Sequence, residues 1–577
     1  MTMLTKWGAA LDRSCPLPEY PRPQLRRESF YNLNGVWDYA VTPSGDEPGV
    51  WDGEIVVPFS PEAPLSGAAR GPAKDEYLHY RRGFTLPEGF QKSRVLLHFG
   101  AVDQIAEVFV NGVSAAKHSG GYWPFSADIT SLLREGENIL RVTVRDNADD
   151  PTFAYGKQRY KRGGMWYTAQ SGIWQTVWLE SVPEVYVKSL RITPEFDEAR
   201  VRIELETALE SSAAITCDVR AADGSFVAGS WAKGGVCVVP LPGFRAWTPD
   251  DPYLYTLDIT CGEDRVESYF AMRKFSYVEL GGHKVFGLNN VPLFHNGLLD
   301  QGYYPDGLLT PPSDEAMVND IETMKRCGFN MLRKHIKIEP LRWYYHCDRL
   351  GMIVWQDMVS GGQPYSFLHV SALPTLGKVD LPDKDAKPYG RSGVLSRARF
   401  RREMADTVRL LYNCPCIALW TVFNEGWGQF DALDMANELK KLDPTRFIDH
   451  ASGWQDQGYE EMKSRHIYFR PVKLKNDGRA LALTEYGGYI LAVDGHRWTD
   501  KVFGYRICRN SAALAHDYEK LMLGQVLPHI RKEGLTAAVY TQITDVEEEL
   551  NGLMTYDREV LKIPEETLRE INEQLKF

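Results

Sequence analysis

The chain has 577 residues, of which 44% are hydrophobic and 25% are charged, and its formal net charge is −11. This length exceeds one ordinary domain, and the composition is typical of globular proteins with substantial cores. The negative charge argues against a nucleic acid as the main partner, because proteins that bind nucleic acids usually present a basic face.

The cysteines and the N-terminal residues indicate the cellular compartment. The nine cysteines are spread thinly apart from Cys414 and Cys416, and no repeated metal-ligand spacing accompanies that pair. The sequence therefore predicts neither a zinc site nor a disulfide framework, and reduced thiols fit a cytoplasmic protein. MTMLTKWGAALDRS contains no apolar signal-peptide core, and no apolar run is long enough to span a membrane. We expect a cytoplasmic protein with no membrane partner.

Residues 1–183 are predicted to form a β-sandwich. Short alternating stretches such as GVWDYAV (35–41) recur, and Asn111-Gly112 between alternating apolar residues predicts a tight hairpin. An aromatic loop at 152–178 interrupts this pattern. Two interpretations of that loop stay open: it reaches a binding site, or it is a structural plug between domains.

Residues 184–278 have a second set of strand-like stretches, including ARVRIELETA and PYLYTLDI. Fewer than a hundred residues with this pattern suit an immunoglobulin-like sandwich. No residue pattern in the segment indicates chemistry, so we expect it to act as a spacer.

Residues 279–577 alternate short apolar strands with helices. The segment 313–328 is predicted to be a helix, with Ser313 as its N-cap and Gly328 at its end. Eight candidate strands follow one another: VPLFHNGLLD, FNMLRKH, MIVWQDM, IALWTVFNE, RFIDHASG, RHIY, ALALTEYGG and AAVYTQITD. Eight strands in this alternation predict a (β/α)8 TIM barrel.

Two glutamates stand at the ends of predicted barrel strands. Glu425 follows IALWTVFN, and Glu485 ends ALALT on a strand later in the barrel. Residues at the carboxyl ends of barrel strands line the active site, and a glutamate inside the strand core would bury a charge at high cost. Two carboxylates that meet at one barrel mouth are the equipment of glycoside hydrolysis. The alternative, in which each glutamate forms an ordinary salt bridge, fits either residue taken alone better than it fits the pair.

LWTVFNEGWG and LTEYGGY resemble the two signatures of glycoside hydrolase family 2, within the clan of barrel glycosidases. YPRPQLRRESFYNLNGVWDYAV, SGIWQTVWLE, WTPDDPYLYTL and GFNMLRKH extend the resemblance over nearly the whole chain. It implies a jelly-roll domain of sugar-binding type (1–183), an immunoglobulin-like domain (184–278) and a catalytic barrel (279–577).

The resemblance also implies roles for individual residues. Glu425 would be the general acid/base, and Glu485 would be the nucleophile of a retaining reaction through a covalent glycosyl-enzyme. Asn424 would hydrogen-bond the sugar 2-hydroxyl. In a retaining enzyme the two carboxyl groups lie about 5–5.5 Å apart.

Five other residues are expected to bind substrate or to support the site. Arg333 and His335 resemble the family's arginine and histidine after the second strand, although their spacing departs by one residue from the commoner pattern. Arg333 has an alternative role as an orienter of the nucleophile. Tyr468 resembles the tyrosine that holds the nucleophile, and Trp454 and Asp300 are candidates for sugar contacts. Ordinary packing is the alternative for each of the last three.

The sugar specificity is open. Glucuronidases of this family usually bind the substrate carboxylate through an Asn-x-Lys motif, but Asn551 in ELNGLMTYDRE is followed by no lysine, which counts against a glucuronidase. Arg465, Arg470 or Arg497 are the candidates to replace that lysine.

The galactosidase assignment also lacks a diagnostic residue. Large family galactosidases carry a histidine soon after the nucleophile motif and a tryptophan on the last strand, whereas this chain has Gly487-Gly488 and YTQITD. We expect an exo-acting β-galactosidase because that activity is frequent in the family. A β-glucuronidase, a mannosidase or an α-L-arabinosidase is the alternative.

Two further classes are alternatives to an enzyme: an inactive carbohydrate-binding protein, and a structural protein that assembles through its sandwiches. Both leave the paired glutamates without a task. We expect a small glycoside or oligosaccharide as the substrate and a homo-oligomer as the assembly. No cofactor and no metal site are predicted; some family members hold Mg²⁺ near the acid/base, but no residue cluster here supports a Mg²⁺ or Na⁺ ion.

Overall fold

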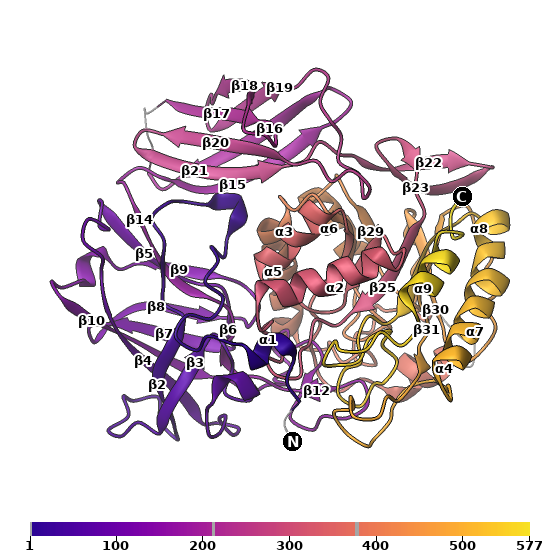
Figure 1. Ribbon diagram of the computed structural model, residues 1–577, viewed down its shortest axis with the longest axis horizontal. Coiled ribbons are helices and arrows are strands. Elements are labelled where there is room, and N and C mark those ends of the chain that lie inside the picture. The colour runs from indigo at the N-terminus through magenta and orange to yellow at the C-terminus, as the bar shows by residue number, and fades with distance from the viewer. Residues whose placement is uncertain (1–2, 210–213, 376–379) are drawn as a thin grey trace.

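The computed structural model describes residues 3–209, 214–375 and 380–577 and has the three domains predicted, in the predicted order (Figure 1). The first domain is drawn in indigo and purple, the second lies above it in magenta, and the barrel runs from pink through orange to yellow. The fold class expected from the sequence is confirmed.

The first domain is a sandwich of two antiparallel sheets. Apolar side chains from the inner faces of both sheets form one buried core that includes Trp37, Tyr80, Leu97 and Leu179. The six strands of one sheet are, in order, β3 (Gly53–Val57), β2 (Gly35–Thr42), β4 (Tyr77–Thr85), β10 (Glu137–Arg145), β7 (Ile105–Val110) and β8 (Val113–Ser119). The other sheet contains β1 (Tyr31–Asn32), β14 (Val177–Val182), β5 (Arg94–Phe99) and β9 (Phe125–Asp128).

The predicted hairpin is confirmed. Asn111 and Gly112 join β7 to β8 with φ angles of +52° and +83°, and a two-residue turn with both φ values positive matches the twist of the flanking strands. The Asn111 side chain also donates to the carbonyl oxygen of Leu132 at 2.8 Å, which fixes the turn to the neighbouring loop.

The second domain is also a sandwich, with buried residues such as Ile203, Val219 and Leu257 between its sheets. Its strands are β15 (Val187–Glu195), β16 (Arg200–Thr207) and β19 (Val236–Pro240) in one sheet, and β18 (Phe226–Trp231), β17 (Ile215–Arg220), β20 (Tyr255–Cys261) and β21 (Asp264–Phe270) in the other. A small sheet of β22 (Phe275–Leu280), β23 (His283–Leu288) and β24 (Val291–Pro292) leads from it to the barrel.

The barrel has the eight strands predicted, and they pair in parallel. Their order in the sheet is β29 (Phe447–Asp449), β28 (Ile417–Thr421), β27 (Ile353–Asp357), β26 (Met331–Lys334), β25 (His295–Asp300), β34 (Leu535–Thr541), β31 (Ala480–Gly487) and β30 (Met462–Ile467). The main helices around them are α2 (Asp314–Arg326), α3 (Leu341–Leu350), α5 (Val394–Leu411), α6 (Ala432–Leu442), α7 (Ser511–Leu521), α8 (Leu527–Glu533) and α9 (Glu565–Asn572).

Helix α2 has the predicted boundaries. The Ser313 hydroxyl accepts a hydrogen bond from the Ala316 amide at 3.2 Å, so it satisfies one of the free N–H groups of the first turn. Met317, Ile321 and Met324 are buried against the barrel. Gly328 follows the helix with a φ of +86°, which a glycine adopts without a steric penalty.

The barrel departs from an ideal (β/α)8 fold at one place. Among the described residues, no helix follows β29 or β30; loops at 450–461 and 468–479 make those two connections. The strands β29 and β30 end the sheet order but lie next to each other. The Ser464 hydroxyl closes this seam, since it donates to Asp449 and lies 3.0 Å from the Ala451 carbonyl oxygen. One flank of the barrel therefore lacks the usual helical cover.

No helix in the described part of the chain combines the length and hydrophobicity needed to cross a bilayer. All nine cysteines are free thiols, and all except Cys15 are buried.

Candidate active site

Glu425 lies four residues beyond strand β28 in a strained backbone conformation. Its φ is +53°, a region that residues other than glycine occupy at a cost of about 1–3 kcal/mol. Two contacts to the next connection hold it there: its amide donates to the Ser452 carbonyl oxygen at 2.9 Å, and its carbonyl accepts from the Trp454 indole at 2.9 Å. Trp454 is half-buried and lies on the rim of the site.

The Glu425 carboxyl group is directed into the barrel mouth. One oxygen lies 2.8 Å from Nδ1 of His466, and the side chain is 21% exposed. Burial raises the pKa of this carboxyl group above its usual value, while the charges of Lys157, His335 and Arg333 act in the opposite direction. A raised pKa is what a general acid at neutral pH requires.

Glu485 lies near the end of strand β31, and both of its oxygens accept hydrogen bonds. Arg333 donates to Oε1 at 3.1 Å, and the Tyr468 hydroxyl donates to Oε2 at 2.5 Å. Tyr468 also stacks on Tyr505 with a centroid distance of 3.9 Å, which limits rotation of the phenol. The carboxylate is thus fixed in direction by two strong donors.

The two glutamates lie close to each other. One carboxylate oxygen of Glu425, one of Glu485 and a ring nitrogen of His466 all lie within 4.8 Å of one another. His466 is the link between them: its Nδ1 faces Glu425, and its Nε2 is 3.6 Å from Glu485.

Arg333 is fully buried and contacts Glu485. Its guanidinium group donates to Asp357 at 3.0 Å, to Glu485 at 3.1 Å and to the Asn424 side-chain oxygen at 2.8 Å. It also donates to the Thr484 carbonyl oxygen at 3.1 Å. These positions fit the orienting role that the sequence left open for Arg333.

His335 and Asp300 are also buried, at the ends of strands β26 and β25. His335 is buried, and its Nδ1 is 2.7 Å from Asp357, the same carboxylate that pairs with Arg333. Asp300 accepts from the Lys334 amine at 2.6 Å and from the Gly302 amide at 2.9 Å. Contact of either residue with a sugar stays a prediction.

Two residues near the glutamates were missed by sequence reasoning. Side chains alternate along a strand, so in RHIY His466 shares the inner face with Tyr468, a signal that could have identified it. Lys157 comes from the 152–178 loop of the first domain, and no sequence pattern indicates that it reaches Glu425.

The 152–178 loop crosses the barrel mouth. Trp166 packs edge-to-face on Trp427 of the Glu425 motif, with centroids 5.1 Å apart. Tyr167 donates a hydrogen bond to Glu549 on the last barrel connection, and the Thr168 amide donates to Glu547 at 2.8 Å. The loop both joins the domains and supplies groups to the site.

The three arginines considered for substrate carboxylate binding separate into two groups. Arg465 and Arg470 line a groove that Glu425 also borders. Arg497 pairs instead with Asp494 at 3.1 Å and Asp500 at 3.8 Å on the surface.

Sequence profiles of one enzyme family match most of the chain. The sugar-binding domain of glycosyl hydrolases family 2 matches residues 64–183, a second profile of that family matches residues 185–273, and its TIM barrel domain matches residues 312–474.

The names of individual relatives indicate one of two activities, β-galactosidase or β-glucuronidase. The chain is 25% identical over 387 residues to a β-galactosidase of Thermoanaerobacter pseudethanolicus, covering 64% of this chain and 47% of the relative. It is 22% identical over 536 residues to a β-glucuronidase of Paenibacillus borealis, covering 82% of this chain and 85% of the relative. The chain spans less than half of the length of the β-galactosidases from T. pseudethanolicus and Halalkalibacterium halodurans, at 47% and 45%.

The solved structure of a β-D-glucuronidase from Dictyoglomus thermophilum has the same fold, with a TM-score of 0.74 at 19% identity. The match covers 96% of this chain and 99% of that chain. Together with the three matched domains and the paired glutamates, these similarities give one conclusion: the chain belongs to glycoside hydrolase family 2.

Proposed function

We propose that this protein is a retaining, exo-acting β-glycosidase that removes a terminal sugar through a covalent glycosyl-enzyme. The observation that carries the proposal is the closeness of Glu425 and Glu485, which bring carboxylate oxygens within 4.8 Å of each other. Retaining enzymes hold their two carboxyl groups about 5–5.5 Å apart, whereas inverting enzymes need about 6.5–9.5 Å to admit a water molecule.

In the first step Glu485 attacks the anomeric carbon while Glu425 protonates the leaving oxygen. The C–O bond to the leaving group breaks as the bond from the Glu485 oxygen forms, and the Glu425 proton ends on the leaving group. The burial that raises the pKa of Glu425 keeps that proton available. Arg333 and Tyr468 fix Glu485 so that little reorganisation is needed during attack.

In the second step Glu425, now a carboxylate, takes a proton from water as the water attacks the same carbon. The Glu485–sugar bond breaks and the starting state returns, with the configuration retained. Asn424 supports both steps: its side-chain oxygen accepts from Arg333, which orients the amide NH₂ group as a donor to the sugar 2-hydroxyl.

A β-galactoside is the first candidate substrate, because several relatives named β-galactosidase match the chain. A β-glucuronide is the second candidate, favoured by the β-glucuronidase of P. borealis, whose length the chain covers to 85%.

Release of nitrophenol from a panel of β-galactoside, β-glucuronide, β-glucoside, β-mannoside and α-L-arabinoside tests the proposal, with Glu485→Gln as the blank. We expect one strong signal that disappears in the variant. Proton NMR of the first-formed sugar then reports the anomer, and an inverted anomer would refute the retaining mechanism. Equal signals from wild type and variant on every sugar would refute the proposed glycosidase activity.

A further inference from the structure

A groove of about 770 Å³ leads away from Glu425 along strand β30. It is lined both by Tyr468, just beyond the carboxyl end of that strand, and by Lys463 near its start. Lys463 and Tyr468 are five residues apart, which corresponds to a strand length of about 16 Å. The groove is therefore longer than the space between the two catalytic glutamates requires.

The missing helices explain why this groove exists. A helix after β29 or β30 would cover the outer face of β30, but loops 450–461 and 468–479 stand in their place. Alternation along β30 directs Ser464 and His466 inward, where they are buried, and leaves Lys463 and Arg465 half-buried on the outer face.

The groove is rich in positive charge although the chain carries a net charge of −11. Five cationic side chains line it: Lys463, Arg465, Arg470, Lys473 and Lys475. The last three are exposed, and in the described ranges none of them forms an ion pair. Such side chains are available to a ligand.

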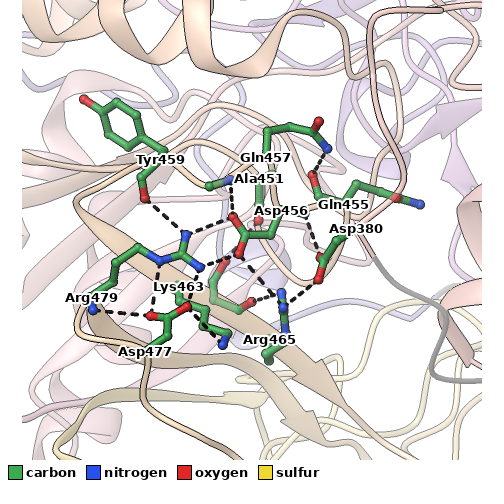
Figure 2. Close-up of polar contacts among 12 residues, drawn as sticks. Asp380, Ala451, Gln455, Asp456, Gln457, Tyr459, Lys463, Arg465, Asp477 and Arg479 are labelled. Atoms are coloured by element: carbon green, nitrogen blue, oxygen red, sulfur yellow. Dashed lines mark hydrogen bonds and ion pairs between the residues drawn. The ribbon is translucent and has the colours of Figure 1, made fainter.

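Lys463 and Arg465 are held in position by aspartates, as Figure 2 shows. Arg465 pairs with Asp380 at 2.9 Å and approaches Asp456 at 3.9 Å, and Lys463 pairs with Asp477 at 3.1 Å.

Arg479 ties the aspartates together. It bonds to both Asp456 and Asp477 at 2.7 Å, so these ion pairs form one connected network. The loop that carries the three unpaired cations is anchored as well, because the Val472 amide donates to Gln525 at 2.8 Å and the Asn476 side chain donates to the Glu533 carbonyl at 2.8 Å.

Aromatic side chains cover the part of the groove nearest to the catalytic centre. Trp454, Phe469, Phe503 and Tyr505 line it there, and Phe469 is 72% exposed. Exposed aromatic faces suit stacking on the apolar faces of sugar rings. The aromatic part followed by the cationic part fits a chain of sugars that carries negative groups.

The position of the groove relative to the cleaved bond follows from its lining. Glu425 borders it and Glu485 does not. The acid protonates the leaving oxygen, so space that touches the acid but not the nucleophile lies on the leaving-group side.

We propose that this groove binds the leaving-group side of an anionic oligosaccharide, in which carboxylate or sulfate groups pair with Arg470, Lys473 and Lys475. This inference rests on the proposed function and adds the substrate class to it.

The test compares two tetrasaccharides with the same non-reducing sugar, the one selected by the nitrophenol panel. In one tetrasaccharide the three following sugars are galactose, and in the other they are galacturonate, so that three carboxylates can reach the three cations. We expect wild type to prefer the galacturonate compound by about tenfold in kcat/KM, since three exposed ion pairs together amount to about 1.4 kcal/mol. The preference should fall as salt is added.

The triple variant Arg470→Gln, Lys473→Gln, Lys475→Gln should lose this preference. Its matched control is Lys117→Gln, Lys188→Gln, Lys233→Gln, which removes the same charge from exposed positions on the two sandwich domains and should keep the preference. Equal kcat/KM for the two tetrasaccharides in wild type, or an unchanged preference in the groove variant, would overturn the proposal. So would a loss confined to uronide nitrophenyl substrates, because the cations would then bind the terminal sugar.

A binding measurement separates this inference from the proposed function. Calorimetric titration of both tetrasaccharides into Glu485→Gln needs no turnover, and galactose stands as the non-reducing sugar if the panel selects none. Tighter binding of the galacturonate compound, lost in the groove variant, supports the groove even if the nitrophenol panel fails. Equal binding of the two compounds refutes the groove even if the panel succeeds.

Discussion

Replacing His466 with alanine should lower the pH at which Glu425, the proposed catalytic acid, loses its proton. The Ser452 hydroxyl donates to Thr484 at 3.0 Å, so its oxygen is free to accept from His466, whose Nε2 lies 3.3 Å away. We infer that the hydrogen of the imidazole sits on Nε2, toward Ser452 and the Glu485 side chain. Nδ1 is then an acceptor, and the group that donates to it at 2.8 Å is the protonated Glu425 carboxyl.

The size and sign of the effect follow from that arrangement. Burial lowers the pKa of His466 to about 3, so the ring is neutral at working pH and the hydrogen bond joins two neutral groups. Such a bond contributes about 0.5–1.5 kcal/mol, and 1.36 kcal/mol corresponds to one pKa unit. A bond to the protonated form raises a pKa, so its loss should lower the pKa of Glu425 by about 0.5–1 unit. Water that enters the vacated space acts in the same direction.

The assay is kcat/KM against pH on the nitrophenyl substrate that the panel identifies. The alkaline limb reports the acid in the free enzyme, and in His466→Ala it should move down by about 0.5–1 pH unit. His466→Asn is the matched control, because its side-chain oxygen can accept the hydrogen bond in place of Nδ1. In this variant the alkaline limb should return most of the way to its wild-type pH. An alkaline limb that stays in place or moves upward, in a variant that unfolds at the wild-type temperature, would refute the assigned tautomer.

Three other substitutions test the remaining contacts. Lys157→Met should move the same limb to higher pH, because burial raises the pKa of Glu425 and the lysine charge lowers it. Without that charge, the pKa of Glu425 should rise. Tyr468→Phe should reduce kcat/KM by about 10- to 150-fold, the equivalent of the 1.5–3 kcal/mol of a hydrogen bond to the charged Glu485, with no large change in the unfolding temperature. Arg333→Lys should destabilise the fold by about 3–5 kcal/mol in urea unfolding, since one ammonium group cannot replace a fork with four buried partners.

The elements that were predicted from sequence are those whose signals are local. Eight apolar runs gave eight barrel strands, and the Asn111-Gly112 turn and the Ser313 cap each depend on residues within a few positions. The paired glutamates were recognisable for the same reason, since each ends an apolar strand.

The parts that escaped prediction depend on long-range placement. Lys157 is far from Glu425 in sequence, and its approach depends on how two domains dock. The missing helices after β29 and β30 escaped prediction because eight apolar strands in sequence indicate a complete (β/α)8 barrel, although Gly458 and Pro471 in the two connections are residues typical of loops. Their consequence, an uncovered cationic flank, is visible only once the strands are placed side by side.

Arg333 shows why the kind of residue can be predicted when its partners cannot. A guanidinium group has five N–H donors in a fixed fork, and burying it requires acceptors on several sides at once. Here these acceptors come from Asp357, Asn424 and Glu485, which stand 24, 91 and 152 positions away in the chain. Each acceptor is itself at a strand end, so the arginine can be satisfied only when the barrel has closed in the correct register. Arg333, which links the Asn424 and Glu485 motifs, thus also makes their geometry conditional on a complete barrel, and a barrel that closes imperfectly would lose this geometry before it lost its overall fold.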